Sequence, residues 1–321
     1  MGIFNSYWYN FISRNNSRNN SKLDSIIITG GLGFIGSRFA KLCIEKGHNI
    51  KIIDKMTYAA NLDRMPAGIE NFPITKKDIC DVTVNDITGY QYVVNFAAET
   101  HVDNSISNGK PFIRSNVEGV FNLLEQSRLL HQYENFKKFI QISTDEVYGD
   151  VLAGESKEGD KLNPSSYYSA TKASADMLVK SACRTYGLPY IITRTCNNYG
   201  PGQHEEKFIP KLEKCLQENK PIPVYTPGTQ SREWIHVDDN CKAIYDLMIS
   251  NEINDIYNIG SGERYTNLEV IDILDKDKKA NIKMVTDRLG HDKRYALNSD
   301  KYKLRFDMSG FTTITFKEYY K

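Results

Sequence analysis

A glycine-rich turn between a β-branched run and a helical segment constrains the fold of this chain most strongly. Residues 25–29 form a short β-branched run, and residues 30–36 then place glycine at their first, fourth and seventh positions. Helical periodicity follows over residues 37–46, and residues 49–54 indicate a second strand. A strand–helix–strand unit of this kind crosses over in the right-handed sense. Its turn also brings backbone N–H groups to the positive end of a helix, where a pyrophosphate binds.

Strand-like and helical segments keep alternating beyond this unit. Alternation of this type predicts an α/β protein with a doubly wound parallel (Rossmann) sheet. The predicted strands lie at residues 92–97, 138–143 and 189–194, and the predicted helices at residues 112–131 and 166–186. Past Arg194 the pattern loosens into turns rich in glycine and proline. We therefore expect a tail at residues 1–24, an NAD-binding domain at 25–195 and a smaller C-terminal substrate-binding domain at 196–321, with the chain free to cross back between them.

Charge and composition exclude several classes of protein. The chain has 321 residues, with 41 Lys and Arg against 40 Asp and Glu, so no strong positive field favours nucleic acid. The six cysteines and six histidines are dispersed, with no spacing typical of a metal site. No apolar run approaches the ~18 residues that a membrane span needs. These features predict a cytoplasmic protein with reduced thiols and no bound metal.

The first 24 residues are rich in Ser, Asn and Arg, which is typical of a disordered tail. Its start, Met1 to Ser6, also fits the short N-myristoylation pattern at Gly2. The basic residues Arg14, Arg18 and Lys22 would add the electrostatic signal that such an anchor needs. An inert tail and a lipidated one therefore both remain open.

Asp54 supports NAD rather than NADP as the cofactor. It ends the second predicted strand, eighteen residues beyond Gly36, where a carboxylate holds a ribose diol and repels a 2′-phosphate. Lys55 weakens this preference without reversing it. We expect Asp78 and Ile79 near the adenine, and residues 96–98 (Phe96, Ala97 and Ala98) beside the nicotinamide ribose.

Tyr168 and Lys172 are separated by one helical turn and form a candidate redox pair. A tyrosine hydroxyl titrates at about 10 in its ordinary state, and we expect the Lys172 charge to lower that pKa. Tyr168 would then accept the proton of a sugar hydroxyl while hydride leaves the same carbon. Thr144, at the end of the preceding predicted strand, lies where an active-site hydroxyl belongs.

Asp145 and Glu146 directly follow Thr144 and form a second acid–base couple. Alcohol oxidation alone does not need such a couple. Once a ketone forms at C4 of a hexose, the C5 proton becomes acidic. Glu146 would remove that proton while Asp145 protonates the departing C6 hydroxyl. The pair therefore predicts an elimination of water coupled to internal redox chemistry.

These segments together resemble the extended short-chain dehydrogenase/reductases, and within them the dTDP-glucose 4,6-dehydratases. The resemblance covers about residues 26–298 and rests on the segments 29–36, 54–62, 96–105, 144–149, 197–201 and 288–295. It implies the roles already given for Thr144, Asp145, Glu146, Tyr168 and Lys172, and a homodimer formed through the helices at 112–131 and 166–186. It also implies deoxysugar synthesis of the rhamnose type.

The resemblance further implies two sets of binding residues. The expected cofactor set is Gly30, Gly33, Phe34, Ile35, Gly36, Asp54, Lys55, Met56, Thr57, Asp78, Ile79, Phe96, Ala97, Ala98, Ser115, Tyr168, Lys172 and Asn198. The expected nucleotide-sugar set is Thr100, His101, Thr144, Asn197, Lys207, Phe208, Pro223, Tyr225, Arg232, Asn267, Arg288 and His291.

Several departures from the family pattern concern the nucleotide end. Leu289 stands where the family usually has Pro, and Thr226-Pro227 replaces a Gly-Asp pair. The segment 271–285 looks shortened, which suggests a trimmed cap. Thymidine and uridine nucleotides therefore both remain open as substrates. Two alternatives to a dehydratase are a UDP-sugar 4-epimerase or decarboxylase, which does not need the Asp145-Glu146 pair, and a non-enzymatic NAD-binding protein.

Overall fold

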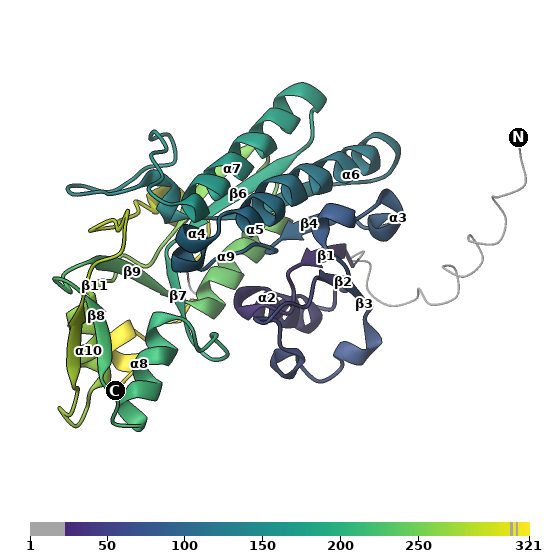
Figure 1. The fold of residues 1–321 in the computed structure, drawn as a ribbon. Coiled ribbons are helices and arrows are strands. Elements are labelled where there is room, and N and C mark those ends of the chain that lie inside the picture. Colours follow the sequence, from purple (N-terminus) through teal and green to yellow (C-terminus); the bar gives the residue numbers. More distant parts are fainter. Residues whose placement is uncertain (1–22, 309–310, 313) are drawn as a thin grey trace, which may run out of the picture.

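The computed structural model describes residues 23–308, 311–312 and 314–321. Figure 1 shows that the described chain joins a large helix-flanked sheet to a smaller group of helices and strands. The motif predicted for lipidation, Met1 to Ser6 with Arg14, Arg18 and Lys22, lies outside the described residues. Within the described ranges, no helix is both long and apolar enough to cross a membrane.

A seven-stranded sheet forms the centre of the larger part, and every strand pairing in it is parallel. In spatial order its strands are β10 (Asp255–Ile259), β6 (Tyr190–Thr195), β5 (Lys138–Thr144), β4 (Tyr92–Asn95), β1 (Ser25–Thr29), β2 (Asn49–Asp54) and β3 (Ile74–Lys76). The strand order reverses between β1 and β4. A crevice opens at the carboxyl ends of the strands at such a switch point. The predicted doubly wound sheet is confirmed.

Helices cover both faces of this sheet, so its strands are buried on both sides. Ile26 and Ile28 of β1 belong to one apolar cluster with Phe39, which lies on α2 (Phe34–Glu45). Ile27 points to the opposite face and belongs to a second cluster with Leu123. Successive side chains of a strand alternate between its faces, which explains why this β-branched run contributes to two clusters. The helices of the second face are α6 (Gly119–Tyr133) and α7 (Tyr167–Tyr186).

The helix predicted at residues 112–131 is interrupted near its start. It consists of α5 (Lys110–Ile113), a π-helical segment η4 (Arg114–Glu118) and α6. Single π-helical turns of this kind often occur at functional sites. The buried side chain of Asn116 lies in this segment, and its contacts are described with the site below.

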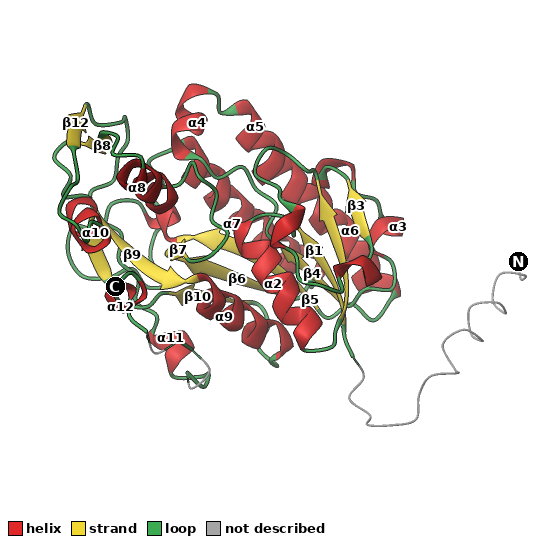
Figure 2. Cartoon of the chain, turned by 90° about the horizontal axis from the view of Figure 1, so that it is seen from below, coloured by secondary structure: helices red, strands yellow, loops and turns green. Residues whose placement is uncertain are grey.

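A third apolar cluster organises the smaller part of the chain. Figures 1 and 2 both show β8, α8 and α10 at the end of the molecule away from β3 and α3. The elements here are β7 (Asn197–Tyr199), α8 (Phe208–Gln217), β8 (Ile222–Tyr225), β9 (Ser231–His236), β11 (Arg264–Thr266), α10 (Asn267–Leu274), β12 (Ile282–Val285) and α12 (Phe316–Tyr319). They form a three-stranded sheet, β11-β9-β7, and a two-stranded sheet, β12-β8.

The chain returns from this smaller part to the large sheet. Helix α9 (Val237–Ile249) packs on the same face as α2, and β10 forms an edge strand beside β6. The large sheet thus uses residues from both sides of the expected boundary at 195. The remaining short elements are η1 (Leu62–Arg64), η2 (Ile69–Asn71), η3 (Ile79–Asp81), α3 (Val84–Ile87), α4 (Val102–Ser107), η5 (Asp145–Tyr148) and α11 (Asp300–Lys303).

A buried ion pair ties α7 to β6 beneath the carboxyl end of the sheet. Asp176 Oδ2 lies 2.9 Å from Arg194 Nε, and the two side chains are almost fully excluded from solvent. Arg194 Nη1 also donates to the Tyr148 hydroxyl at 2.8 Å. Removing one charge from such a pair leaves the other charge buried without compensation.

Replacing Asp176 by asparagine is therefore expected to lower the free energy of unfolding by about 3–5 kcal/mol. Urea denaturation followed by circular dichroism measures this change. Glu45→Gln provides the control, because it removes the partner of Lys41 in an exposed pair 3.8 Å apart. The control is expected to cost less than about 1 kcal/mol, and equal losses in both variants would contradict the role given to the buried pair.

Candidate active site

The glycine turn lets α2 start directly against the end of β1. Gly30 has a φ of +67°, and a Cβ there would lie 2.6 Å from the backbone nitrogen of Ala97. A Cβ on Gly36 would lie 2.3 Å from the Gly30 carbonyl oxygen. Only residues without side chains allow this approach of helix, turn and neighbouring strand. As a result, the first N–H groups of α2, which have no partner within the helix, face the crevice at the switch point.

Asp54 is fixed at the end of β2 by two backbone groups of the surrounding loops. Its carboxylate accepts from the N–H of Leu32 at 3.0 Å and from the N–H of Met56 at 2.7 Å. Lys55, which was expected to weaken the preference for NAD, pairs with Asp78 instead of Asp54: its Nζ lies 2.9 Å from Asp78 Oδ2. Among the described residues, the Asp54 carboxylate therefore accepts from backbone groups and has no cationic side-chain partner. This arrangement favours a ribose diol over a 2′-phosphate.

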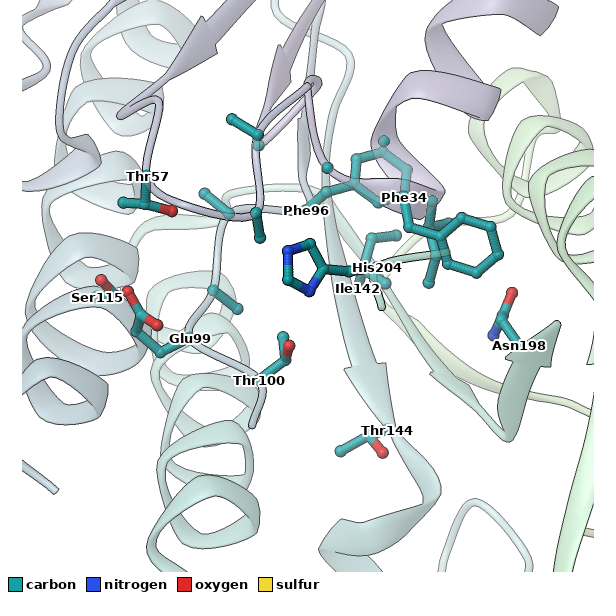
Figure 3. A pocket seen from close by; sticks show the side chains of 18 of the residues that line it. Phe34, Thr57, Phe96, Glu99, Thr100, Ser115, Ile142, Thr144, Asn198 and His204 are labelled. Carbon is teal, nitrogen blue, oxygen red and sulfur yellow. The ribbon is translucent and has the colours of Figure 1, made fainter. Parts of the chain in front are cut away.

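A cavity of about 350 Å³ follows the carboxyl ends of the central strands. Figure 3 shows several of the side chains around it, including Phe34, Glu99, Thr144 and His204. Seventeen of the eighteen expected cofactor residues line this cavity: Gly30, Gly33, Phe34, Ile35, Gly36, Asp54, Lys55, Thr57, Asp78, Ile79, Phe96, Ala97, Ala98, Ser115, Tyr168, Lys172 and Asn198. Met56 does not line it and contributes its backbone N–H to Asp54 instead.

The residues around the cavity fit a dinucleotide. The space beside Gly30 and Gly36 admits no Cβ, the first N–H groups of α2 face the crevice, and Asp54 lies at the far end of the turn. An anionic pyrophosphate matches the helix terminus, and a ribose matches the carboxylate. Tyr168 and Lys172 of α7 line the same cavity, and the Tyr168 side chain forms a hydrogen bond with Thr144.

The reactive end of the cavity is built where β5 ends. The Thr144 hydroxyl accepts from the N–H of Glu146 at 3.3 Å and donates to Asp145 Oδ1 at 3.1 Å. Thr144, Glu146, Tyr168 and Lys172 line the cavity, whereas Asp145 lies behind its wall with only 2 % of its surface exposed. The structure thus brings together all five predicted catalytic residues, with Asp145 in the least accessible position.

Tyr168 and Lys172 lie on the first turns of α7, which Ser166 caps by accepting from the Ser169 N–H at 3.1 Å. Lys172 Nζ donates to the Ile142 carbonyl at 2.5 Å, and burial lowers the pKa of Lys172 to about 8. The predicted lowering of the tyrosine pKa is wrong for the protein alone. Burial raises the pKa of Tyr168, and the negative charge of Glu146 adds to this rise, while a hydrogen bond with Thr144 opposes it.

Asp145 and Glu146 are neighbours in sequence but have different electrostatic surroundings. Burial raises the pKa of Asp145 well above its ordinary value, and the anions of Glu146 and Glu233 add to the rise, against one cation, Arg232. Burial also raises the pKa of Glu146, but three cations oppose it there: Arg232, Arg288 and Lys207. The site therefore favours a protonated Asp145 beside a more readily ionised Glu146. Paired carboxyls with separated pKa values are typical of an acid and a base working together.

The residues expected to hold a nucleotide-sugar fall into two groups. Four of them line the cavity, namely Thr100, Thr144, Asn197 and Lys207. Lys207 Nζ donates to the Thr100 hydroxyl at 3.1 Å. The other expected residues lie outside the cavity lining: His101, Phe208, Pro223, Tyr225, Arg232, Asn267, Arg288 and His291.

Several of these outer residues still contact one another. Asp103 accepts from the Tyr225 hydroxyl at 3.0 Å and lies 3.5 Å from Arg288 Nη1. The ring of His291 stacks edge-on against Tyr225, with centroids 5.5 Å apart. Arg232 lies over the ring of Tyr295 at 4.3 Å. In contrast, Asn267 donates hydrogen bonds to Gln230, from its backbone N–H at 3.1 Å and from its side-chain amide at 3.5 Å.

Sequence reasoning missed part of the cavity wall. The additional lining residues are Ala59, Ala60, Arg64, Glu99, Ile142, Ser143, Thr195, Cys196, Gln203, His204 and Glu206. Glu99 is positioned by Asn116, whose side-chain oxygen accepts from the Glu99 N–H at 2.9 Å and whose amide donates to the Glu99 carbonyl at 3.0 Å. The same amide donates to Thr171 of α7 at 3.0 Å. A π-helical turn carrying a clamping asparagine has no simple sequence signal.

Comparison with known proteins agrees with this site. The model of the NAD dependent epimerase/dehydratase family matches residues 26–260. The chain belongs to this family. The resemblance to the dTDP-glucose 4,6-dehydratases is confirmed, and so is the prediction of NAD as the family's cofactor.

Two relatives illustrate the range of similar sequences. Low-salt glycan biosynthesis protein Agl12 of Haloferax volcanii is 42% identical over 286 residues, which cover 87% of this chain and 91% of that protein. The dTDP-glucose 4,6-dehydratase of Neisseria meningitidis is 39% identical over 321 residues, which cover 91% of this chain and 90% of that protein.

Solved structures of family members have the same fold. The dTDP-glucose 4,6-dehydratase of Streptomyces venezuelae with NAD and TYD bound superposes with a TM-score of 0.86 at 34% identity, covering 92% of this chain and 94% of that one. The UDP-glucose 4-epimerase of Thermus thermophilus in complex with NAD gives a TM-score of 0.83 at 25% identity, covering 92% and 96%. Fold similarity therefore extends to both dehydratases and epimerases of the family, and the site residues must distinguish them.

Gly36→Ala is expected to weaken NAD binding by roughly tenfold or more, equivalent to about 1.4 kcal/mol. The added Cβ would meet the Gly30 carbonyl at 2.3 Å, so α2 must move away from the turn that presents its N–H groups. Isothermal titration calorimetry of cofactor-free protein measures the change. Gly159→Ala is the control, because nothing lies within 4 Å of the Cβ it would add, and equal affinities in both variants would contradict this account of the turn.

Proposed function

We propose that the protein is a nucleotide-sugar 4,6-dehydratase, a lyase that converts dTDP-glucose or UDP-glucose to the 4-keto-6-deoxy sugar nucleotide. One observation carries the proposal: Asp145 and Glu146 lie beside Thr144 and Tyr168 at the same strand end, in surroundings that separate their proton affinities. The names of the similar dehydratases support the same reaction. A 4-epimerase would use Tyr168 and Lys172 but does not require a second acid–base pair.

The first step is oxidation at C4 of the glucose ring. Bound NAD supplies the hydride acceptor and later the donor at C6, and in its oxidised form a positive charge that favours the tyrosine phenolate. Tyr168 accepts the proton of the C4 hydroxyl, while Thr144 holds that hydroxyl. Lys172 is tied to the Ile142 carbonyl and keeps its ammonium group at the cofactor end of the cavity. These residues account for the oxidative half of the reaction.

The second step removes water across C5 and C6. Glu146 lines the cavity and takes the C5 proton, which the C4 ketone makes acidic. Asp145 donates its proton to the C6 hydroxyl, so that water leaves and a double bond forms between C5 and C6. Burial raises the pKa of Asp145 well above its ordinary value, which favours retention of this proton until the C6 hydroxyl leaves.

Basic and aromatic groups beyond the cavity are suited to the nucleotide diphosphate. Lys207, Arg232 and Arg288 add positive charge near Glu146, and guanidinium groups pair well with phosphate oxygens. Tyr225 presents a ring next to His291. Thymine and uracil differ by one methyl group, which is worth only ~1–3 kcal/mol of discrimination. Both nucleotides therefore belong to the proposal.

The proposal also includes a cytoplasmic homodimer that acts in deoxysugar synthesis of the rhamnose type. Three large apolar side chains of α6 and α7 support an interface on these helices: Phe121, Tyr167 and Met177 are exposed by 55%, 62% and 46%. Paired helices from two subunits would cover them as a four-helix bundle.

The experiment that tests the function uses dTDP-glucose and UDP-glucose, each carrying deuterium at C4. Mass spectrometry and NMR are expected to show a 4-keto-6-deoxy product with the deuterium at C6, because the hydride is removed and returned within one active site. The ratio of the two kcat/KM values identifies the preferred nucleotide. Product whose hexose keeps its C6 hydroxyl and is inverted at C4 would replace the proposal with an epimerase.

Glu146→Gln is expected to separate oxidation from elimination. The amide cannot take the C5 proton, so formation of the 4-keto-6-deoxy product should fall by a factor of about 10²–10⁴. Oxidation at C4 should continue, because Tyr168 and Lys172 are unchanged. Stopped-flow absorbance of reduced nicotinamide after mixing with substrate measures this oxidation. A complete absence of the signal would show that Glu146 acts before elimination.

Tyr168→Phe is the matched comparison for this variant. Phenylalanine keeps the ring and its contact with Phe112, whose centroid lies 6.5 Å away, and removes only the hydroxyl. Without an acceptor for the C4 hydroxyl proton, both the reduced-nicotinamide signal and product formation should fall together, by a factor of about 10² or more. Loss of product alone, with a normal absorbance signal, would assign the proton transfer at C4 to another residue.

A further inference from the structure

Two loops that start on opposite sides of the large sheet meet over the cofactor cavity. Residues 57–64 follow β2, and residues 200–207 follow β7, which comes after β6 in the chain. In the sheet, β1, β4 and β5 lie between β2 and β6. Since neighbouring strands are about 4.8 Å apart, roughly 19 Å separates β2 from β6. A contact between the two loops therefore spans the carboxyl ends of β1, β4 and β5, which lie along the cavity.

Both loops form part of the cavity wall. The lining residues are Thr57, Ala59, Ala60 and Arg64 of the first loop and Gln203, His204, Glu206 and Lys207 of the second. In the view of Figure 3, the His204 ring lies between Thr57 and Phe34, among the side chains that surround the cavity. Tyr58 does not line the cavity, and 58% of its surface is exposed. It therefore lies on the outer side of the first loop.

Tyr58 joins the first loop to the second through two contacts. Its hydroxyl donates to Glu206 Oε1 at 3.3 Å. Its ring meets that of His204 edge-on, with centroids 5.4 Å apart. Burial raises the pKa of Tyr58 to about 12, and the negative charge of Glu206 adds to this rise. The hydroxyl is thus a protonated hydrogen-bond donor to Glu206 at neutral pH.

Arg64 anchors the base of the first loop. Its Nη1 donates to the Ala59 carbonyl at 2.7 Å and to the Leu32 carbonyl of the glycine turn at 3.3 Å. The same side chain lies against the second loop, because a Cβ on Gly202 would be 3.6 Å from Arg64 Cδ. The first loop is thereby tied to the glycine turn, while its outer edge reaches the second loop through Tyr58.

We propose that Tyr58, His204 and Glu206 form a strap across the cofactor cavity, and that opening of this strap limits the exchange of NAD. Both loops line the cavity, so NAD enters and leaves when they separate. Loop opening of this kind often limits ligand release. The strap joins groups of the protein to each other, so a weaker strap speeds entry and exit alike. NAD is the cofactor of the family, and the strap therefore does not depend on the proposed dehydratase reaction.

Tyr58→Phe tests the strap, because it keeps the ring beside His204 and removes only the hydroxyl. Protein loaded with isotope-labelled NAD is mixed with an excess of unlabelled NAD, and the loss of label gives the dissociation rate. This rate should rise about three- to tenfold, which is the effect of one lost hydrogen bond. The association rate, measured by stopped flow with cofactor-free protein, should rise by a similar factor, so that Kd stays close to the wild-type value.

Two further variants show whether the hydroxyl acts through Glu206. In Glu206→Ala the acceptor is already absent, so adding Tyr58→Phe should not raise the dissociation rate further. Glu205→Ala is the control, because Glu205 is the neighbour of Glu206 but pairs with Lys214 at 2.8 Å and does not line the cavity. The control should keep the wild-type rate.

The inference is overturned if Tyr58→Phe releases NAD at the wild-type rate, or if it has its full effect in the Glu206→Ala background. It is also overturned if Kd rises with the release rate at an unchanged association rate, since the Tyr58 hydroxyl would then bind NAD directly. Equally fast release from Glu205→Ala would contradict it too, because the second loop would then be loosened as a whole. All of these rates are measured without a sugar substrate, so they test the strap even if the proposed function fails.

Discussion

The site depends on the close approach of α2, the β1 turn and the end of β4. Gly30 and Gly36 allow this approach because a side chain at either position would overlap backbone atoms at less than 3 Å. The contact sets the position of the helix terminus and of the Asp54 carboxylate, which accepts from the same turn through Leu32. The strands β4, β5 and β6 follow β1 in order across the sheet. The positions of their carboxyl ends, which line the rest of the cavity, therefore depend on this contact.

Burial at the carboxyl edge of the sheet explains the chemistry better than any single ion pair. Removing Asp145, Tyr168 and Lys172 from solvent raises the pKa of the two acids and lowers that of the amine to about 8. Each group is thereby driven toward its neutral form before a ligand arrives. In the proposed reaction, the cationic nicotinamide ring opposes this tendency for the two acids. Without ligands, the protein favours the protonated forms of Asp145 and Tyr168, and proton transfer from them depends on the bound cofactor and substrate.

The sequence was sufficient to predict the elements that carry local signals. The strands predicted at residues 25–29 and 49–54 and the helix predicted at residues 166–186 agree with the structure within a few residues, because β-branched runs and helical periodicity are local properties. The π-helical segment around Asn116 could not be predicted, since it depends on contacts with Glu99 and Thr171 from other parts of the chain. The return of β10 to the large sheet is likewise a tertiary preference that no local pattern contains.

The two neighbouring carboxyls show most clearly why sequence reasoning stops short of mechanism. Asp145 and Glu146 could be recognised as an acid–base couple from their position after Thr144, but nothing local decides which of them keeps its proton. Burial raises the pKa of both carboxyls, and charges from β9 and from the segments that carry Lys207 and Arg288 add the difference: Glu233 raises the pKa of Asp145, and the cations oppose the rise at Glu146. These charges lie more than sixty residues away along the chain. Side chains of the smaller part of the protein therefore contribute to the difference in proton affinity between two adjacent side chains on the larger part.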